Sequence, residues 1–153
     1  MFRKLLEKFG PKRLDDPLFG RLVFIKTRDP AKSYWEGTGT FPGTGTQIEF
    51  SVDGPSEGPG KEQQAFYNKL VEKYDDVKNM VSPLLAEHLA RWTRKSPPQD
   101  VWTAFRLSSV SIPLRDSSDA EWDLGFNCSL DREYFFTVYM KGWAPSGPVS
   151  IDD

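Results

Sequence analysis

The chain has 153 residues but only one cysteine, Cys128, and one histidine, His88. A single cysteine excludes an internal disulfide bond and any zinc site built from several cysteines. Nucleophilic catalysis by a Cys–His pair needs both side chains in one place. The apolar spacing puts His88 in a helix, whereas Cys128 falls on the inward side of a strand, where a thiol usually behaves as a small hydrophobic group. The sequence therefore favours a protein without catalytic activity.

Charge of one sign is also missing, because 20 Lys and Arg residues are balanced by 22 Asp and Glu residues. A nucleic-acid-binding domain typically carries a basic stripe, so we expect no nucleic-acid partner. Long apolar runs are absent as well. None approaches the roughly 20 residues of a transmembrane helix, and none forms the core of a secretory signal. We expect a cytoplasmic protein, in keeping with its unpaired cysteine.

The sequence also lacks motifs for cofactors and metals. The four glycines from Gly37 to Gly45 are not followed by the Gly-Lys-Ser/Thr ending of a phosphate loop, and they do not join a strand to a helix. A strand and a hairpin turn account for them, so we expect no cofactor. Asp116 and Asp119 lie in a predicted loop, but calcium loops have a denser spacing of ligands, so we expect no metal.

What is present is a clear alternation of strands and helix. Residues 22–25 are apolar throughout, residues 34–41 are rich in aromatic residues and threonine, and residues 47–52 alternate between apolar and polar side chains. Turn residues at 42–45 join the second of these segments to the third. The first part of the chain therefore predicts three strands, two of them joined in a hairpin.

The apolar period then lengthens to that of a helix over residues 61–81. Pro83 should end this helix, but it suits the first turn of a second one with Ser82 as its N-cap. A short turn capped by Asp100 is expected to follow. The middle of the chain thus predicts two helices and a turn.

Alternation returns at residues 110–114, 121–128 and 134–141, and a last short apolar piece covers 149–151. Together the segments predict one α+β domain at residues 14–153. In it, an N-terminal three-strand block and a C-terminal three- or four-strand block form an antiparallel sheet, and the central helices pack on one face. Residues 1–13 predict a separate amphipathic helix, which could cover the sheet, bind a partner or lie on an anionic membrane.

The outward face of the predicted sheet combines acidic and aromatic side chains. Aromatic anchors supply contact area and charges select the partner, so the mixture is typical of a protein-binding surface. The residues predicted to bind a partner are Trp35, Glu49, Glu121, Asp123, Phe135 and Tyr139. Three tryptophans, Trp35, Trp122 and Trp143, are expected to have a structural role first.

Several short blocks follow one another in a specific order. They are Asp16–Leu22, Tyr34–Gly37, Gly58-Pro59, Gln63–Tyr67, Phe105–Pro113, Glu121–Leu124, Phe136–Val138, Gly142-Trp143 and Val149–Asp152. In this order they resemble an uncharacterised family of small bacterial proteins, a domain of unknown function, over nearly the whole chain after the first 15 residues. The resemblance implies no activity and no site residues. The layout is also similar to that of toxin-immunity domains, although layout does not determine function.

The sequence therefore predicts a small non-catalytic domain that binds another protein, of an adaptor or immunity-like kind. The alternative is an enzyme or small-ligand binder with a site of scattered Asp, Glu, Tyr and Trp side chains. That alternative would show as a deep pocket with convergent polar groups. The identity of a partner and the oligomeric state do not follow from the sequence.

Overall fold

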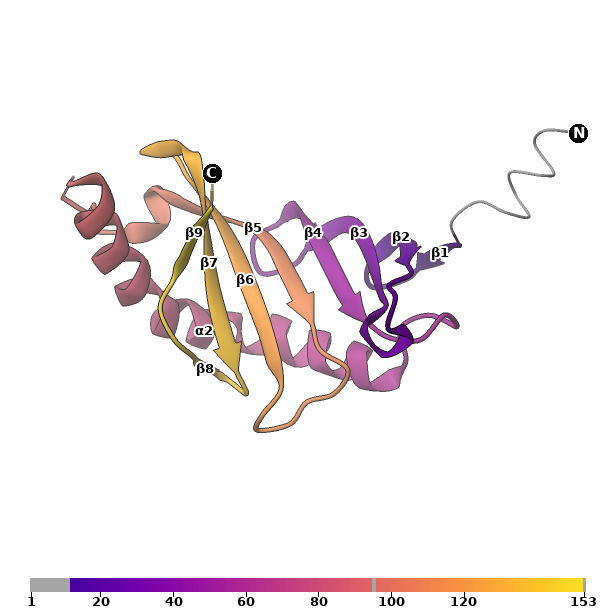
Figure 1. Cartoon of the computed structure of the whole chain (residues 1–153). Helices are drawn as coiled ribbons and strands as arrows, with labels where there is room; N and C mark the ends of the chain where they lie inside the picture. The colour runs from indigo at the N-terminus through magenta and orange to yellow at the C-terminus, as the bar shows by residue number, and fades with distance from the viewer. Residues whose placement is uncertain (1–11, 95, 153) are drawn as a thin grey trace, which may run out of the picture.

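A nine-stranded sheet and one long helix, α2 (Lys61–Thr93), form the frame of the described residues, 12–94 and 96–152, of this computed structural model (Figure 1). The fold is α+β with a mostly antiparallel sheet, as the sequence predicts. Two short 3-10 turns, η1 (Pro30–Lys32) and η2 (Val101–Thr103), lie between strands. The strands are β1 (Arg13–Asp16), β2 (Gly20–Ile25), β3 (Tyr34–Phe41), β4 (Thr46–Asp53), β5 (Phe105–Ile112), β6 (Glu121–Cys128), β7 (Asp131–Lys141), β8 (Ala144–Pro145) and β9 (Ser150–Asp152).

The strands follow one another across the sheet in chain order from β1 to β8, and β9 pairs with β7. The neighbours are antiparallel except at the centre, where β4 and β5 are parallel. A parallel pair needs a long crossover, and α2 supplies it by running along one face of the sheet (Figure 1). The structure thus differs from the expected antiparallel blocks at the point where the two halves of the sheet meet.

Among the described residues, four strands precede the helix and five follow it, one more than predicted before it and at least one more after it. The extra strand β1 contains a single apolar residue, Leu14, so it has no alternation that a pattern could reveal. Its antiparallel pairing with β2 defines it. Asp100 caps η2 as expected, because its carboxylate accepts a hydrogen bond from the backbone N–H of Trp102 at 3.0 Å.

The prediction of two helices with a break at Pro83 is wrong. A single helix runs through this proline, which lies inside α2 with an exposed side chain. Val81, Leu85 and Leu89 are fully buried on one stripe that passes the proline without a change of face. A proline removes one backbone hydrogen bond. Here the apolar stripe on both sides is held in the core, and this packing keeps the helix continuous.

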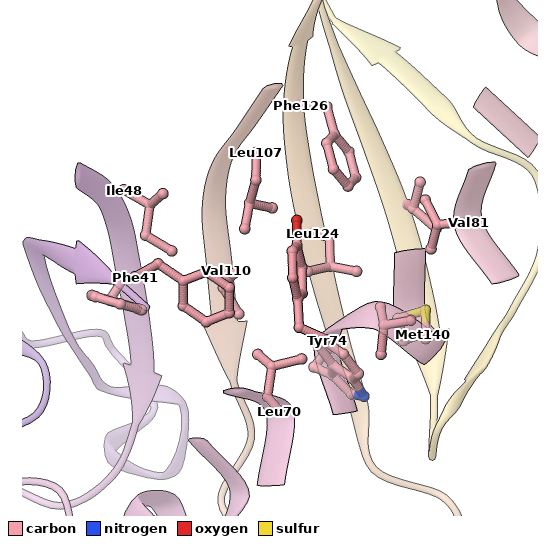
Figure 2. Close-up of a cluster of buried hydrophobic side chains, with 14 of the residues drawn as sticks. Phe41, Ile48, Leu70, Tyr74, Val81, Leu107, Val110, Leu124, Phe126 and Met140 are labelled. Atoms are coloured by element: carbon pink, nitrogen blue, oxygen red, sulfur yellow. The ribbon is translucent and has the colours of Figure 1, made fainter. Parts of the chain in front are cut away.

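The inward side chains of the sheet and one face of α2 form a shared core. The alternation predicted for residues 47–52 and 121–128 is confirmed, because their apolar side chains are buried. In the predicted buried strand at 22–25, only Leu22 is fully buried. Figure 2 shows that side chains from β3 to β7 meet those of α2: Phe41, Ile48, Leu107, Val110, Leu124, Phe126 and Met140 from the strands, with Leu70, Tyr74 and Val81 from the helix.

The amphipathic helix predicted at residues 1–13 falls almost entirely on residues 1–11, which lie outside the described part of the chain. Arg13 belongs to β1. In residues 12–94 and 96–152, no helix combines the length and the apolar composition needed to cross a membrane.

Candidate functional site

The face of the sheet turned away from α2 carries mostly polar side chains. On β4 these are Glu49, Ser51 and Asp53, because the alternate positions are buried in the core. The register of the parallel pair sets Ser111 of β5 beside Ser51. Strand β6 lies next to β5, and the backbone N–H of Asp123 on β6 donates a hydrogen bond to Oγ of Ser111 at 2.7 Å. Polar groups from three neighbouring strands therefore meet at the middle of this face.

Five of the six residues predicted to bind a partner share this outward face: Glu49, Glu121, Asp123, Phe135 and Tyr139. Trp35 does not, because its side chain is fully buried. Its indole N–H donates to the carbonyl of Pro55 at 2.8 Å. Trp35 thus has the structural role that the sequence analysis gave it, and it adds nothing to an exposed surface.

The two aromatic residues predicted to bind a partner on this face differ in how far they are exposed. The ring of Phe135 lies over Gly125, where a Cβ atom would come within 2.3 Å of the ring. Phe135 is half-buried, and its ring packs over this glycine. Tyr139 has 47% of its surface exposed. Tyr139 is therefore the aromatic side chain that remains available for contact.

A hollow of about 490 Å³, here called the acidic hollow, lies beside Tyr139. Besides that residue it is lined by Ser51, Asp53, Ser111, Glu121, Trp122, Asp123, Met140 and Ser146. Glu49 lies on the same face but outside the hollow. Polar groups thus converge here from β4, β5, β6 and β7 beside the exposed ring of Tyr139.

Three carboxylates, those of Asp53, Glu121 and Asp123, line the acidic hollow. Partial burial, together with the charge of Asp123, raises the pKa of Asp53. Burial also raises the pKa of Asp123, although a hydrogen bond from Ser111 acts in the opposite direction. Glu121 lies opposite Lys141 in the sheet register. In the described part of the chain, Asp53 and Asp123 take part in no ion pair.

Asp53 is the residue that sequence reasoning missed. The strand predicted at residues 47–52 ends one residue before it, whereas Asp53 is the last residue of β4. A signal was present, because Asp53 continues the outward positions of Glu49 and Ser51 at a spacing of two residues. Its nearness to Asp123 depends on the pairing of strands far apart in the chain, which no local pattern reveals.

The described residues contain no group of three or more His, Cys, Asp or Glu side chains arranged to hold a metal ion. The loop carboxylates weighed in the sequence analysis have other partners. Asp116 accepts hydrogen bonds from Lys69 at 2.7 Å and from the indole of Trp143 at 2.9 Å, and these bonds lower its pKa. Asp119 accepts a hydrogen bond from Ser117 at 2.7 Å.

The only histidine and the only cysteine have different surroundings. His88 lies on α2 beside Trp92, with 6.4 Å between the ring centroids, and it forms a hydrogen bond with the backbone of Val149. Burial, then the charge of Arg91, lowers the pKa of His88. Cys128 is buried at the end of β6.

No protein-family model, curated protein or solved structure matches this chain. The resemblance to an uncharacterised bacterial family therefore depends on the short sequence blocks alone, and function has to be argued from the site.

Proposed function

We propose that this protein is a non-catalytic, cytoplasmic protein-binding domain whose outer sheet face receives an arginine side chain of a partner. The observation that carries the proposal is the convergence of the Asp53 and Asp123 carboxylates beside the exposed ring of Tyr139 in the acidic hollow, where neither carboxylate takes part in an ion pair of the described residues. A cation placed between them would relieve their repulsion. An adaptor or immunity-like role would use such a contact to select its partner.

Three features of the acidic hollow favour arginine as the contacting group. A guanidinium is planar and presents a fork of donors that matches carboxylates, and it is more weakly hydrated than an ammonium. The exposed ring of Tyr139 offers a flat face on which a cation can lie. The volume of about 490 Å³ falls within the roughly 300–1,000 Å³ of ligand pockets. Nearby Glu49 adds further negative charge to the same face.

The arginine contact can be tested by titrating the full chain with N-acetyl-arginine amide and recording backbone amide shifts by NMR. We expect shifts centred on Ser111, Asp123 and Tyr139 that weaken with added salt. N-acetyl-citrulline amide, which has the same shape without the charge, should cause no such shifts. Equal shifts with citrulline would contradict a charge-based site.

Variants distinguish binding of arginine at the acidic hollow from a general attraction of arginine to an acidic protein. Asp53→Asn with Asp123→Asn should abolish the arginine shifts. The control, Asp75→Asn with Asp76→Asn, changes net charge by the same amount on the exposed surface of α2 and should retain them. Retention of the shifts in the first variant would overturn the proposed site.

The protein partner itself is tested by affinity capture and mass spectrometry with these variants and Tyr139→Ala. We expect the same captured protein with wild type and with the α2 control, and its loss with the other two variants. A partner that binds all four proteins equally would place the interface elsewhere.

A further inference from the structure

A second and larger hollow, here called the basic cleft, opens where β4 and β5 separate. These strands pair only over Glu49–Val52 and Ser109–Ile112, so the residues before each segment diverge. The β3–β4 turn lies on one side of the opening and η2 lies on the other. The cleft has a volume of about 770 Å³. Its lining includes Thr46, Tyr74, Lys78, Trp102, Arg106 and Arg132.

The charge of this cleft is opposite to that of the whole protein. Lys78 of α2, Arg106 of β5 and Arg132 of β7 line it, and its described lining contains no Asp or Glu. None of the three cations takes part in an ion pair of the described residues. The chain as a whole has a net charge of −2. Its overall charge therefore does not account for three cations without an ion-pair partner around one opening.

Aromatic rings form part of the wall. The Nζ atom of Lys78 lies 5.1 Å from the centroid of the Trp102 ring and 5.9 Å from that of Tyr74, so two cation–π contacts hold the ammonium group. Trp102 is half-buried and packs against Phe126, with 5.7 Å between the ring centroids. The wall therefore combines a fixed positive charge with a flat apolar surface.

The opposite wall is equally well supported. Tyr74 packs edge-on against Phe41 at 4.9 Å, and a Cβ atom added to Gly43 would approach the Tyr74 ring to 2.7 Å. The β3–β4 turn thus lies directly against this ring. Burial, followed by the charge of Asp75, raises the pKa of Tyr74 to about 12. A wall that is already ordered costs little to organise on binding.

We propose that the basic cleft binds a small organic anion in which a carboxylate or phosphate is attached to a planar apolar ring. Arginine forks bind either oxyanion through charge-assisted hydrogen bonds, and the exposed part of the half-buried Trp102 indole offers apolar surface to the ring of the ligand. The volume of the cleft lies within the range of small-molecule sites. This site is separate from the acidic hollow and does not depend on the protein-binding role.

The test uses the full chain, isothermal titration calorimetry and the indole N–H signal of Trp102 in NMR. Phenyl phosphate and benzoate are the probes, inorganic phosphate lacks the ring, and benzyl alcohol lacks the charge. We expect at least one anionic ring compound to bind and to shift the Trp102 signal, and the stronger of the two identifies the oxyanion. Failure of both probes to bind, or binding of benzyl alcohol or inorganic phosphate as tight as theirs, would overturn the proposal.

Variants locate the binding. Arg106→Gln with Arg132→Gln should weaken it by about tenfold or more, because each arginine supplies charge-assisted hydrogen bonds. The control, Arg28→Gln with Arg115→Gln, removes two exposed arginines outside the cleft and should leave the affinity within about twofold. Lys78→Met, which keeps the apolar stem, should weaken binding as well. Equal affinity in the first variant and wild type, or an equal loss in the control, would contradict the assignment.

Discussion

At the scale of single residues, the candidate site is defined by two carboxylates, Asp53 and Asp123, that have no ion-pair partner among the described residues. Most charged side chains on the surface of a protein are well hydrated and interact only weakly with neighbouring charges. Asp53 and Asp123 differ, because each is partly removed from water and Asp123 adds its charge to the surroundings of Asp53. Such groups are typical of functional sites, where charge is arranged for a ligand at a cost to the free protein.

This arrangement predicts how stability depends on pH. A carboxyl whose pKa is raised by folding binds its proton more tightly in the native state. Its contribution to stability is therefore complete below the unfolded pKa, near 4, and is lost as the pH rises through the folded pKa. Asp53→Asn with Asp123→Asn should be more stable than wild type at about pH 7, and the difference should shrink toward about pH 4.

Urea unfolding at both pH values measures the effect. The α2 variant Asp75→Asn with Asp76→Asn should show little change at either pH. A double variant at Asp53 and Asp123 that is less stable than wild type near neutral pH would contradict the cost of ionising these partly buried carboxylates.

At the scale of elements, α2 shows that packing can outweigh a local helix-breaking signal. The stripe of Val77, Val81, Leu85 and Leu89 is buried on both sides of Pro83. Burying an aliphatic side chain of this kind stabilises by roughly 1.5–3 kcal/mol, so several of them exceed the roughly 3 kcal/mol cost of a proline inside a helix. The helix continues because its apolar face lies on the sheet along its length.

Replacing the proline should therefore stabilise the protein. Pro83→Ala restores a backbone N–H inside α2 at an exposed position, and we expect the free energy of unfolding to rise by about 1–3 kcal/mol. Part of the gain is offset by the greater freedom of alanine in the unfolded chain. Urea unfolding followed by circular dichroism measures the change. A loss of stability would show that Pro83 has a packing role of its own.

At the scale of the whole molecule, α2 joins the two halves of the sheet. Tyr67 packs against Phe19 and Phe50 of the first half, with ring centroids 5.0 and 5.6 Å away. Its neighbour Phe66 packs against Trp122 of the second half at 5.1 Å. The strands themselves meet over only four paired residues between β4 and β5. The halves are therefore joined both by this parallel pairing and by the side chains of the helix.

A shared core of this kind predicts cooperative unfolding. Helix content, measured by far-UV circular dichroism, and the fluorescence of Trp35 and Trp122, which lie in different halves, should change at the same urea concentration. Two separate midpoints would show that the halves unfold independently, and that the helix belongs energetically to only one of them.

Much of the local structure could be predicted because it depends on residues close together in the chain. The alternation along β4 and β6, the hairpin turn at residues 42–45 and the Asp100 cap are all of this kind. Part of the candidate site could also be predicted, because alternation alone puts Asp123 and Tyr139 on the outward side of their strands.

The sequence by itself determined most of the strands, the helical character of the middle of the chain and the apolar side of strands such as β4 and β6, because these properties repeat with the period of the backbone. Only the tertiary structure decided that β4 lies parallel to β5, that α2 passes Pro83, and that Asp53 lies near Asp123. The same holds for Lys78, Arg106 and Arg132 around one cleft. Each of these outcomes depends on packing between segments distant in the chain, and that packing is selected by the fit of the whole core.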